Sequence, residues 1–262
     1  MGEKIFQVDA FTHEPFKGNP AGVMLLTTAK PDEWMQDFAR EKNLSETAFL
    51  IKLQDKYLLR WFTPKVEVDL CGHATLASAH VLFSERLVEK DETILFESAS
   101  GILKARYVDG WIELDFPAFQ VRTGKVTPQI TEALGFEPRE VFESDVNLLV
   151  EMNGLEEVRG YLPNFEKLAT LPFQGLIITS RMVGEFDFCS RYFAPQAGIN
   201  EDPVTGSAHC SLAPFWAPRL GKNGFTAYQA SERGGMLKVR LENNRTFIQG
   251  QAVTIFDGEL RV

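Results

Sequence analysis

Four side chains of this 262-residue chain have types and positions suited to moving a proton. Two are carboxylates, Glu46 and Asp202, and two others, His73 and Ser207, each directly follow a glycine. Two carboxylates in different environments can divide the roles of proton acceptor and proton donor, because desolvation raises the pKa of one of them toward neutrality. The near-neutral pKa of a histidine suits a proton relay. We therefore start from the hypothesis of general acid–base catalysis.

An internal repeat marks the positions of these residues. Three short motifs reappear in the same order in the second half, at offsets of 131 (191 minus 60) and 134 (206 minus 72). The pairs are Arg60–Pro64 with Arg191–Pro195, Gly72–Ala74 with Gly206–Ala208, and Gly101–Arg106 with Gly235–Arg240. We infer a duplication, because the offsets are about half the chain length. We expect two halves, residues 1–116 and 117–262, with a boundary within 117–138 and with terminal strands free to cross to the other half.

The repeated glycines, Gly72 and Gly206, each precede a segment that we expect to be a buried helix. A glycine there lets a ligand approach the backbone, and the N–H groups of the first helical turn are free donors. If the halves face each other about a pseudo-twofold axis, both helix starts meet at one cleft and hold a carboxylate. Each helix dipole contributes about 0.3–1 kcal/mol at an exposed end and up to about 2 kcal/mol when partly buried. The alternative is that both glycines only serve tight strand-to-helix turns.

The two halves differ where the carboxylates stand. The stretch between the repeated proline and the repeated glycine is seven residues long in the first half (65–71) and ten in the second (196–205). The longer version contains Asp202, which is therefore expected to have no counterpart. Conversely, Glu46 shifted by 131 falls on Ile177, within a plain apolar strand. The alternative is that Ser45-Glu46 forms a turn or cap and that Asp202-Pro203 only starts a loop.

The cysteines offer a different chemistry. Cys71, Cys189 and Cys210 form no Cys-x-x-Cys pair, so neither a disulfide framework nor a thiolate zinc site is predicted, and we expect the thiols to be reduced. Cys71 precedes the first expected helix and could be a low-pKa thiolate. The matching position in the second half is Thr205, so a two-thiol mechanism is not supported.

The elements that must position these residues are mostly strands. Short β-branched or aromatic runs predict strands at 57–62, 93–97 and 175–179. Residues 104–116 predict a hairpin with its turn at Asp109-Gly110, and Asp257-Gly258 predicts a second hairpin turn.

Residues 73–83 predict a helix that is apolar on nearly every face and is therefore buried. Its counterpart, from Ser207, contains Pro214 and Pro218 and should kink or end early. His80 and His209 lie deeper in these two helices and are interpreted as core residues. Further helices are expected at 32–40 and 131–135. Each half is thus predicted to be a curved, mostly antiparallel sheet wrapped around a central helix, an α+β fold.

Composition narrows the class of protein. Hydrophobic residues make up 44% and charged residues 24%, as in ordinary globular chains, so a disordered or fibrous protein is not predicted. The net charge of −9 disfavours binding to nucleic acid or to an anionic membrane, although a small anion can still be held locally. The sequence shows no signal-peptide pattern and no apolar run of about 18 residues, so we expect a cytoplasmic protein. The common nucleotide-binding, zinc-protease and hydrolase motifs are absent from it.

Five motifs together resemble the phenazine-biosynthesis-like (PhzF) isomerase family. They are Gly18–Gly22, Asn43–Phe49, Arg60–Pro64, Cys71–Thr75 and Glu201–Ala208. The resemblance implies a diaminopimelate-epimerase-like fold of two pseudo-symmetric halves, usually a homodimer, without cofactor or metal.

The resemblance also implies roles. In the best-understood member of the family a glutamate moves a proton within a dihydro-hydroxyanthranilate, helped by a histidine, an aspartate and a serine. These catalytic residues match Glu46, His73, Asp202 and Ser207, and the substrate-binding residues match Asn19, Ser45, Gly72 and Gly206. The leading hypothesis is a cofactor-independent isomerase acting on a small carboxylate-bearing metabolite. The alternatives are a non-catalytic metabolite-binding or interaction protein and an amino-acid epimerase or racemase.

Overall fold

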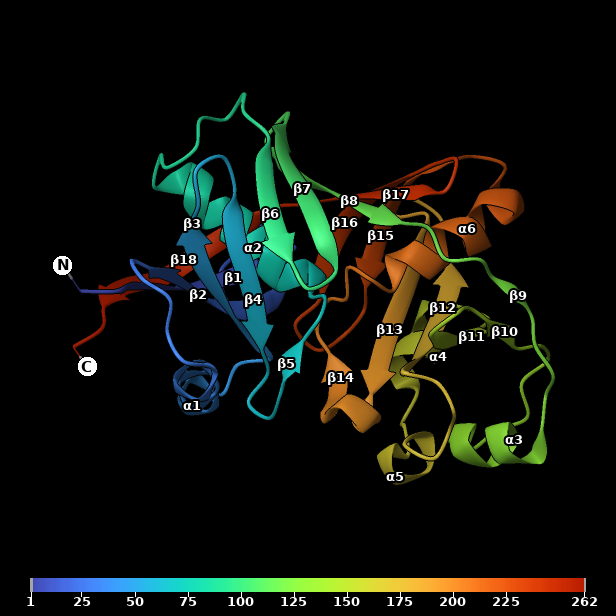
Figure 1. Cartoon of the computed structure of the whole chain (residues 1–262). Coiled ribbons are helices and arrows are strands. Elements are labelled where there is room, and N and C mark those ends of the chain that lie inside the picture. The colour runs from blue at the N-terminus through green and yellow to red at the C-terminus, as the bar shows by residue number, and fades with distance from the viewer. Residues whose placement is uncertain (1, 262) are drawn as a thin grey trace. The chain divides into compact units, whose positions relative to one another are not determined.

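The computed structural model describes residues 2–261 and divides into two compact units (Figure 1). The first unit contains the chain up to Phe116 and the residues from Ile248 onward, and the second unit contains Pro117–Phe247. The chain therefore leaves the first unit once and returns to it near the C-terminus. Among the described helices, none has the length and apolar character needed to span a bilayer.

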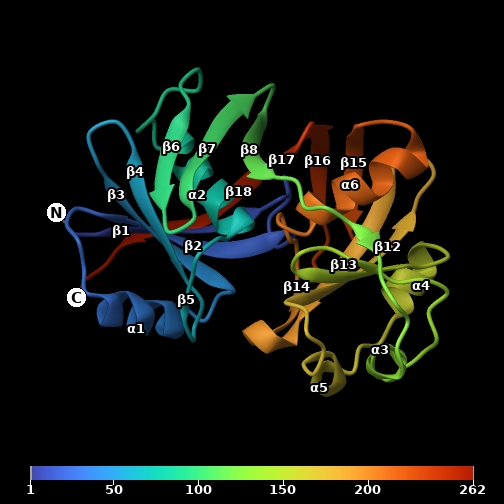
Figure 2. The same ribbon diagram turned by 45° about the vertical axis from the view of Figure 1, so that its right-hand side comes forward.

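The first unit is a mostly antiparallel sheet. Its strands are β1 (Lys4–Ala10), β2 (Asn19–Leu26), β3 (Glu46–Lys52), β4 (Tyr57–Phe62), β5 (Glu67–Val68), β6 (Ile94–Ser98), β7 (Gly101–Val108), β8 (Trp111–Pro117) and β18 (Ala252–Glu259). Strands β2 and β3 pair in parallel, as do β4 and β6, whereas β1–β2, β3–β4, β6–β7 and β1–β18 are antiparallel. The helix α1 (Asp32–Lys42) can be found in Figure 2 by its label. Its residues Met35 and Ala39 pack with Phe49 and Phe62 of this sheet.

The second unit repeats this order of strands. Its elements are β9 (Arg122–Thr123), α3 (Pro128–Leu134), β10 (Phe142–Glu143), β11 (Asn147–Glu151), α4 (Leu155–Gly160), α5 (Phe165–Leu168), β12 (Gly175–Arg181), β13 (Phe188–Ala194), a 3-10 turn (Pro195–Ala197), β14 (Ile199–Asp202), α6 (His209–Leu220), β15 (Gly224–Gln229) and β16 (Gly235–Glu242). Strand β17 (Arg245–Gly250) crosses the boundary between the units in sequence.

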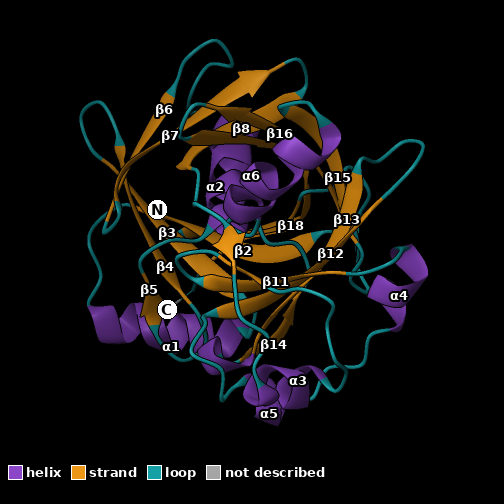
Figure 3. Cartoon of the chain, turned by 90° about the vertical axis from the view of Figure 1, so that its right-hand side faces the viewer, coloured by secondary structure: helices purple, strands orange, loops and turns teal. Residues whose placement is uncertain are grey.

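The pairing pattern of the two units is the same. Strands β11–β12 and β13–β15 are parallel, and β10–β11, β12–β13 and β15–β16 are antiparallel. The series β1-β2-β3-β4-β6-β7 of the first unit thus matches β10-β11-β12-β13-β15-β16 of the second. The α+β fold of two similar halves is confirmed. Apolar residues of α3, α4 and α5 pack on those of β11, β12 and β13, and the three helices can be followed in Figure 3.

The predicted central helix of the first unit is α2 (Gly72–Ser84), in which every residue except His80 and Ser84 is buried. It contacts β1, β2, β3 and β18, so apolar residues are needed on nearly all of its faces. Fully burying a leucine such as Leu76 or Leu82 contributes about 1.5–3 kcal/mol. The interpretation of this segment as a buried helix is confirmed.

The second central helix differs from its prediction. Helix α6 begins at His209 rather than Ser207 and continues through Pro214 and Pro218 to Leu220, so of the two expected outcomes, a kink or an early end, the early end is wrong. Pro214 cannot donate to the carbonyl of Cys210, four residues earlier. That carbonyl accepts a hydrogen bond from the N–H of Phe119 instead (2.9 Å), which satisfies it without breaking the helix.

One predicted hairpin turn is correct and the other is wrong. Asp109 and Gly110 have φ of 48° and 85° and join β7 to β8, as their left-handed preference predicts. Asp257 and Gly258 lie inside β18 and pair with β1. The turn near the C-terminus is at Asn243 (φ 52°), between β16 and β17.

Candidate active site

The first part of the candidate site lies at the start of β3 and α2. Glu46 is the first residue of β3, Cys71 precedes α2 and His73 is its second residue, and all three side chains are more than nine-tenths buried. The His73 ring lies between the other two: Nε2 is 3.1 Å from Oε2 of Glu46 and Nδ1 is 3.5 Å from Sγ of Cys71. Neither Nε2 nor Oε2 makes a hydrogen bond of good angle within the described residues, so both atoms keep bonding capacity for a ligand.

The contacts within this cluster favour a protonated imidazole. Burial alone lowers the pKa of His73, but its contacts with Cys71 and with the Glu46 carboxylate outweigh burial and hold that pKa well above 6.5. Burial and then the Glu46 carboxylate raise the pKa of Cys71 to about 11, although His73 lowers it in part. The thiol is therefore protonated at neutral pH, and the expectation of a low-pKa thiolate is wrong.

Glutamate, cysteine and histidine are also metal-binding types, and their ligand atoms here lie within 4.8 Å of one another. However, the two present contacts use different nitrogens of the same ring. In the present arrangement the three groups form a linear chain of contacts through the His73 ring.

The second part of the candidate site is at the end of β14. The Thr205 hydroxyl donates to Oδ2 of Asp202 at 2.5 Å. Gln229 Nε2 donates to the backbone carbonyl of Asp202 (2.7 Å) and to Oγ1 of Thr205 (3.2 Å), and Gln229 Oε1 accepts from the Thr205 N–H (2.8 Å). Asp202, Thr205 and Gln229 are all buried. The sequence does not predict Gln229 as a site residue, because no motif near it indicates that its side chain contacts Asp202 at the end of β14.

The two repeated glycines have different backbone settings. Gly72 is the first residue of α2, and the first helical bond runs from Thr75 N–H to the Cys71 carbonyl. The N–H groups of residues 72–74 precede that bond and point out of the helix end. Gly206 instead lies three residues before α6, in a turn where the His209 N–H donates to the Gly206 carbonyl. The half-buried Ser207 lies in the same turn, so the expectation that Gly206 directly precedes its helix is wrong.

Strand register corrects the expected twin of Glu46. Thr47 pairs with Phe62 in the first unit, and Leu176 pairs with Phe193, the repeat of Phe62, in the second. The counterpart of Glu46 is therefore Gly175 rather than Ile177. A Cβ atom at Gly175 would lie 2.4 Å from the Tyr192 ring, so no side chain fits there without movement.

Asp202 does have a positional counterpart. Tyr192 pairs with Asp202, and Trp61, 131 residues before Tyr192, pairs with Val68. Asp202 thus stands where the first unit has a valine, and the expectation of no counterpart position is wrong. The carboxylate itself remains particular to the second unit.

A repeated arginine clamp fixes both short strands, β5 and β14. Arg60 binds Glu67 through Nε (2.6 Å) and Nη2 (2.7 Å), and Arg191 binds Glu201 in the same way (2.7 and 2.8 Å). Nη1 of Arg191 also donates to the carbonyls of Val158, Arg159 and Tyr161. The recurrence of the two arginines in the sequence was the available signal for this clamp.

Two further residues, Asn19 and Ser45, are expected to bind substrate. They lie two residues before Ala21 and one residue before Glu46, and Ala21 and Glu46 pair with each other between β2 and β3. Asn19 is fully buried at the start of β2, and Ser45 is half-buried directly before Glu46. Because β2 and β3 are parallel with Ala21 opposite Glu46, the starts of both strands are neighbours in the first unit. The structure thus brings Glu46 together with His73, and Asp202 with Thr205, each within its own unit.

The two helix histidines, both expected to be core residues, differ in burial. His209 is fully buried, with Nδ1 2.9 Å from the Thr205 carbonyl, and burial lowers its pKa to about 4. His80 is half-buried beside Thr254 (3.0 Å), and burial likewise lowers its pKa to about 4. His209 is confirmed as a core residue.

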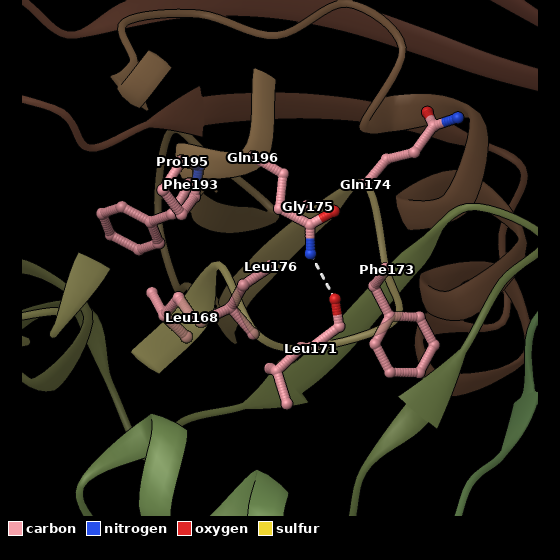
Figure 4. Close-up of a pocket in the computed structure, with 9 residues that line it drawn as sticks. All are labelled: Leu168, Leu171, Phe173, Gln174, Gly175, Leu176, Phe193, Pro195 and Gln196. Atoms are coloured by element: carbon pink, nitrogen blue, oxygen red, sulfur yellow. Dashed lines mark hydrogen bonds between the residues drawn. The ribbon is translucent and has the colours of Figure 1, made fainter. Parts of the chain in front are cut away.

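A small cavity in the second unit does not extend the site. It measures about 10 Å³ and is lined mainly by apolar side chains, with Gln196 Nε2 donating to the Leu171 carbonyl beside it (Figure 4). This volume holds at most about one water molecule. We interpret the cavity as a gap in core packing.

Comparison with known proteins agrees with this fold. An uncharacterized isomerase of Halalkalibacterium halodurans is 50% identical over 99% of both chains. The crystal structure of a PhzF-family phenazine biosynthesis protein of Enterococcus faecalis has 42% identity and a TM-score of 0.95 over the whole of both chains. A hydroxyproline epimerase of Agrobacterium vitis, at 12% identity, shares the fold with a TM-score of 0.67, covering 98% of this chain and 92% of its own.

The family-level comparison covers nearly all of the chain. The sequence model described as phenazine biosynthesis-like protein (PhzC-PhzF) matches residues 8–258. That range includes every residue of both parts of the candidate site. The chain therefore belongs to the phenazine biosynthesis-like (PhzC/PhzF) protein family.

Proposed function

We propose that this protein is an isomerase that moves a proton by general acid–base catalysis on a small carboxylate-bearing metabolite, without a cofactor. The observation that carries the proposal is the buried pair of Glu46 and His73, with Oε2 and Nε2 3.1 Å apart. Buried ionisable pairs of this kind are typical of catalytic sites. Two relatives that are each 50% identical to this chain are named uncharacterized isomerases, which supports the same reaction class.

Glu46 is the proposed proton acceptor. Its Oε2 faces the imidazole, and transfer of a proton from a substrate carbon to the carboxylate followed by return to another carbon of the same molecule completes an isomerisation. His73 stabilises the carboxylate before transfer, because its raised pKa keeps the imidazole protonated near neutral pH. Positioned acid–base groups contribute about 10²–10⁴ in rate.

Asp202 and Ser207 are proposed to act in the same reaction, as the acid–base groups that the second unit supplies. Substrate binding is proposed for Asn19 and Ser45 and for the backbone N–H groups of Gly72 and Gly206. A helix start such as that of α2 suits a carboxylate, because its first N–H groups and its dipole both favour a negative charge.

The assembly and the partners belong to the same proposal. We expect a homodimer in the cytoplasm that binds a small anion. We expect it to bind neither nucleic acid nor a membrane surface, because its net charge of −9 repels both. Light scattering and cell fractionation test the dimer and its location.

Deuterium exchange tests the reaction. The protein is incubated in D2O with a panel of cyclic and amino acids, and exchange at a carbon is followed by NMR. Exchange should fall by about 10²-fold or more in Glu46→Gln. The matched control is Glu113→Gln, another buried glutamate of the first unit, bound to Arg106 and Gln249. Equal exchange in the wild type and Glu46→Gln would show that the proposed base is wrong.

The alternatives give different results. A non-catalytic binder would be stabilised thermally by a ligand that never exchanges. A two-thiol racemase would lose essentially all activity in Cys71→Ala, and Thr205, which has no thiol, at the matching position does not favour it.

A further inference from the structure

We propose that Cys71 and Thr205 are positioning residues with the same role in the two units: each binds the acid–base group of its own unit and fixes its orientation. The inference rests on the proposed function of His73, Glu46 and Asp202. It assigns a role to two buried side chains that the proposed reaction leaves unused.

The two residues occupy equivalent positions. Thr205 follows Cys71 by 134 residues (205 minus 71), the offset of the repeat, and each directly precedes a repeated glycine. Both side chains are 6% exposed. Each contacts a group of its own unit that lies two or three residues away, His73 in one case and Asp202 in the other.

In the first unit the thiol holds the imidazole ring. Sγ of Cys71 is 3.5 Å from Nδ1 of His73, and Nε2 of the same ring is 3.1 Å from Glu46. A neutral thiol can donate to a neutral imidazole and can accept from a protonated one. In both protonation states, therefore, Cys71 contacts Nδ1 and directs Nε2 toward Glu46.

In the second unit the direction of the hydroxyl proton follows from its partners. Gln229 Nε2 donates to Oγ1 of Thr205, so Oγ1 is the acceptor of that bond and its own hydrogen is free to point elsewhere. The other close partner of Oγ1 is Oδ2 of Asp202 at 2.5 Å, a length typical of a hydroxyl donating to a carboxylate. The hydroxyl thus stabilises the ionised form of Asp202 and fixes one of its oxygens.

The test in the second unit uses Thr205→Val, which keeps the shape and removes the donor. With 13C-labelled aspartate, the titration midpoint of the Asp202 carboxyl should move up by about one pH unit, a ten-fold change in proton affinity. Thr205→Ser should restore the wild-type midpoint. If Thr205→Val does not fold, Gln229→Leu provides the second variant, with a smaller shift of the same sign because the hydroxyl can then rotate away from Asp202.

The test in the first unit compares Cys71→Ala with Cys71→Ser. The 15N resonance of His73 Nδ1 should move in the alanine variant and return in the serine variant. The kcat of proton exchange should fall about 3- to 10-fold in Cys71→Ala, with KM within about twofold, as for the loss of one hydrogen bond. A merely structural role would change thermal stability without moving the Nδ1 resonance or separating kcat from KM.

The controls remove equivalent buried groups elsewhere in the second unit. Thr179→Val deletes a hydroxyl that donates to the Cys189 carbonyl, and Cys210→Ser alters another buried thiol. Neither should move the Asp202 midpoint or the His73 resonance. Unchanged NMR readouts in Thr205→Val and Cys71→Ala overturn the positioning role. Altered readouts without any exchange in the wild type would support the positioning role and reject the proposed reaction.

Discussion

His73 Nε2 lies 3.1 Å from Oε2 of Glu46, and both side chains are more than nine-tenths buried. An isolated charge at this depth would be costly, whereas a protonated imidazole and a carboxylate in contact offset each other. The pair is therefore sensitive to any change that neutralises one partner.

The stability of the protein should fall as the pH rises above the unfolded-state pKa of His73, about 6.5. The folded-state pKa is raised, so the folded protein keeps a proton that the unfolded chain loses. The stabilisation is complete below about 6.5 and is lost as the pH rises through the folded-state value. Urea unfolding between pH 6.5 and 8.5 measures the slope, which should disappear in His73→Gln and persist in the exposed control His13→Gln. A slope that His73→Gln leaves intact would refute the assignment.

Acid should destabilise the protein through His209. Burial lowers its folded-state pKa to about 4, so the unfolded chain takes up a proton first as the pH falls. The loss of folding stability occurs as the pH falls from about 6.5 to about 4. It amounts to roughly 3 kcal/mol, because the pKa of His209 differs by about 2.5 between the unfolded and the folded state. His209→Phe should make this part of the pH–stability curve less steep, measured by urea unfolding, and the slope that remains contains the contribution of His80, whose pKa is also lowered to about 4. His73→Gln serves as the control that retains it, and an unaltered curve in His209→Phe would contradict the prediction.

The two arginine clamps should differ in energy although they are repeats. The Arg191 side chain is 11% exposed and also binds carbonyls of the second unit, whereas the Arg60 side chain is 26% exposed and its additional partner, Asp32, is exposed. Arg191→Lys should lower the free energy of unfolding by about 3 kcal/mol, and Arg60→Lys by about 1 kcal/mol or less. Chemical denaturation of both variants measures their free energies of unfolding. Equal losses of that free energy in the two variants would contradict the predicted difference between the clamps.

A side chain at Gly175, the counterpart of Glu46, should destabilise the protein. Gly175→Ala places a Cβ atom 2.4 Å from the Tyr192 ring, so the ring or the strand must shift, at a cost of about 1–3 kcal/mol. Gly224→Ala is the control, since a Cβ atom there has no neighbour within 4 Å in the described structure. Thermal unfolding compares the two variants, and similar midpoints would show that Tyr192 moves freely.

Local sequence patterns predict the structure correctly where neighbouring residues decide it. The strand 57–62 has the bounds that its apolar run predicts, and the Asp109-Gly110 turn forms because both residues accept positive φ. Asp257-Gly258 has the same turn composition but lies within β18, because pairing with β1, far away in the sequence, outweighs the local preference. Likewise, α6 passes Pro214 because the distant Phe119 N–H satisfies the freed carbonyl.

In the candidate site, too, some features can be predicted from the sequence and others depend on the tertiary structure. The sequence by itself established the duplication, the motifs that carry Glu46, His73, Asp202 and Ser207, and the place of Cys71 and Thr205 before the repeated glycines. Only the tertiary structure decided that Glu46 corresponds to Gly175, that Cys71 and Glu46 contact opposite nitrogens of His73, and that Gln229 joins Asp202 and Thr205. The reason is that a repeat offset counts residues along the chain. Strand register, burial and hydrogen-bond direction depend on partners that the chain brings together only when it folds.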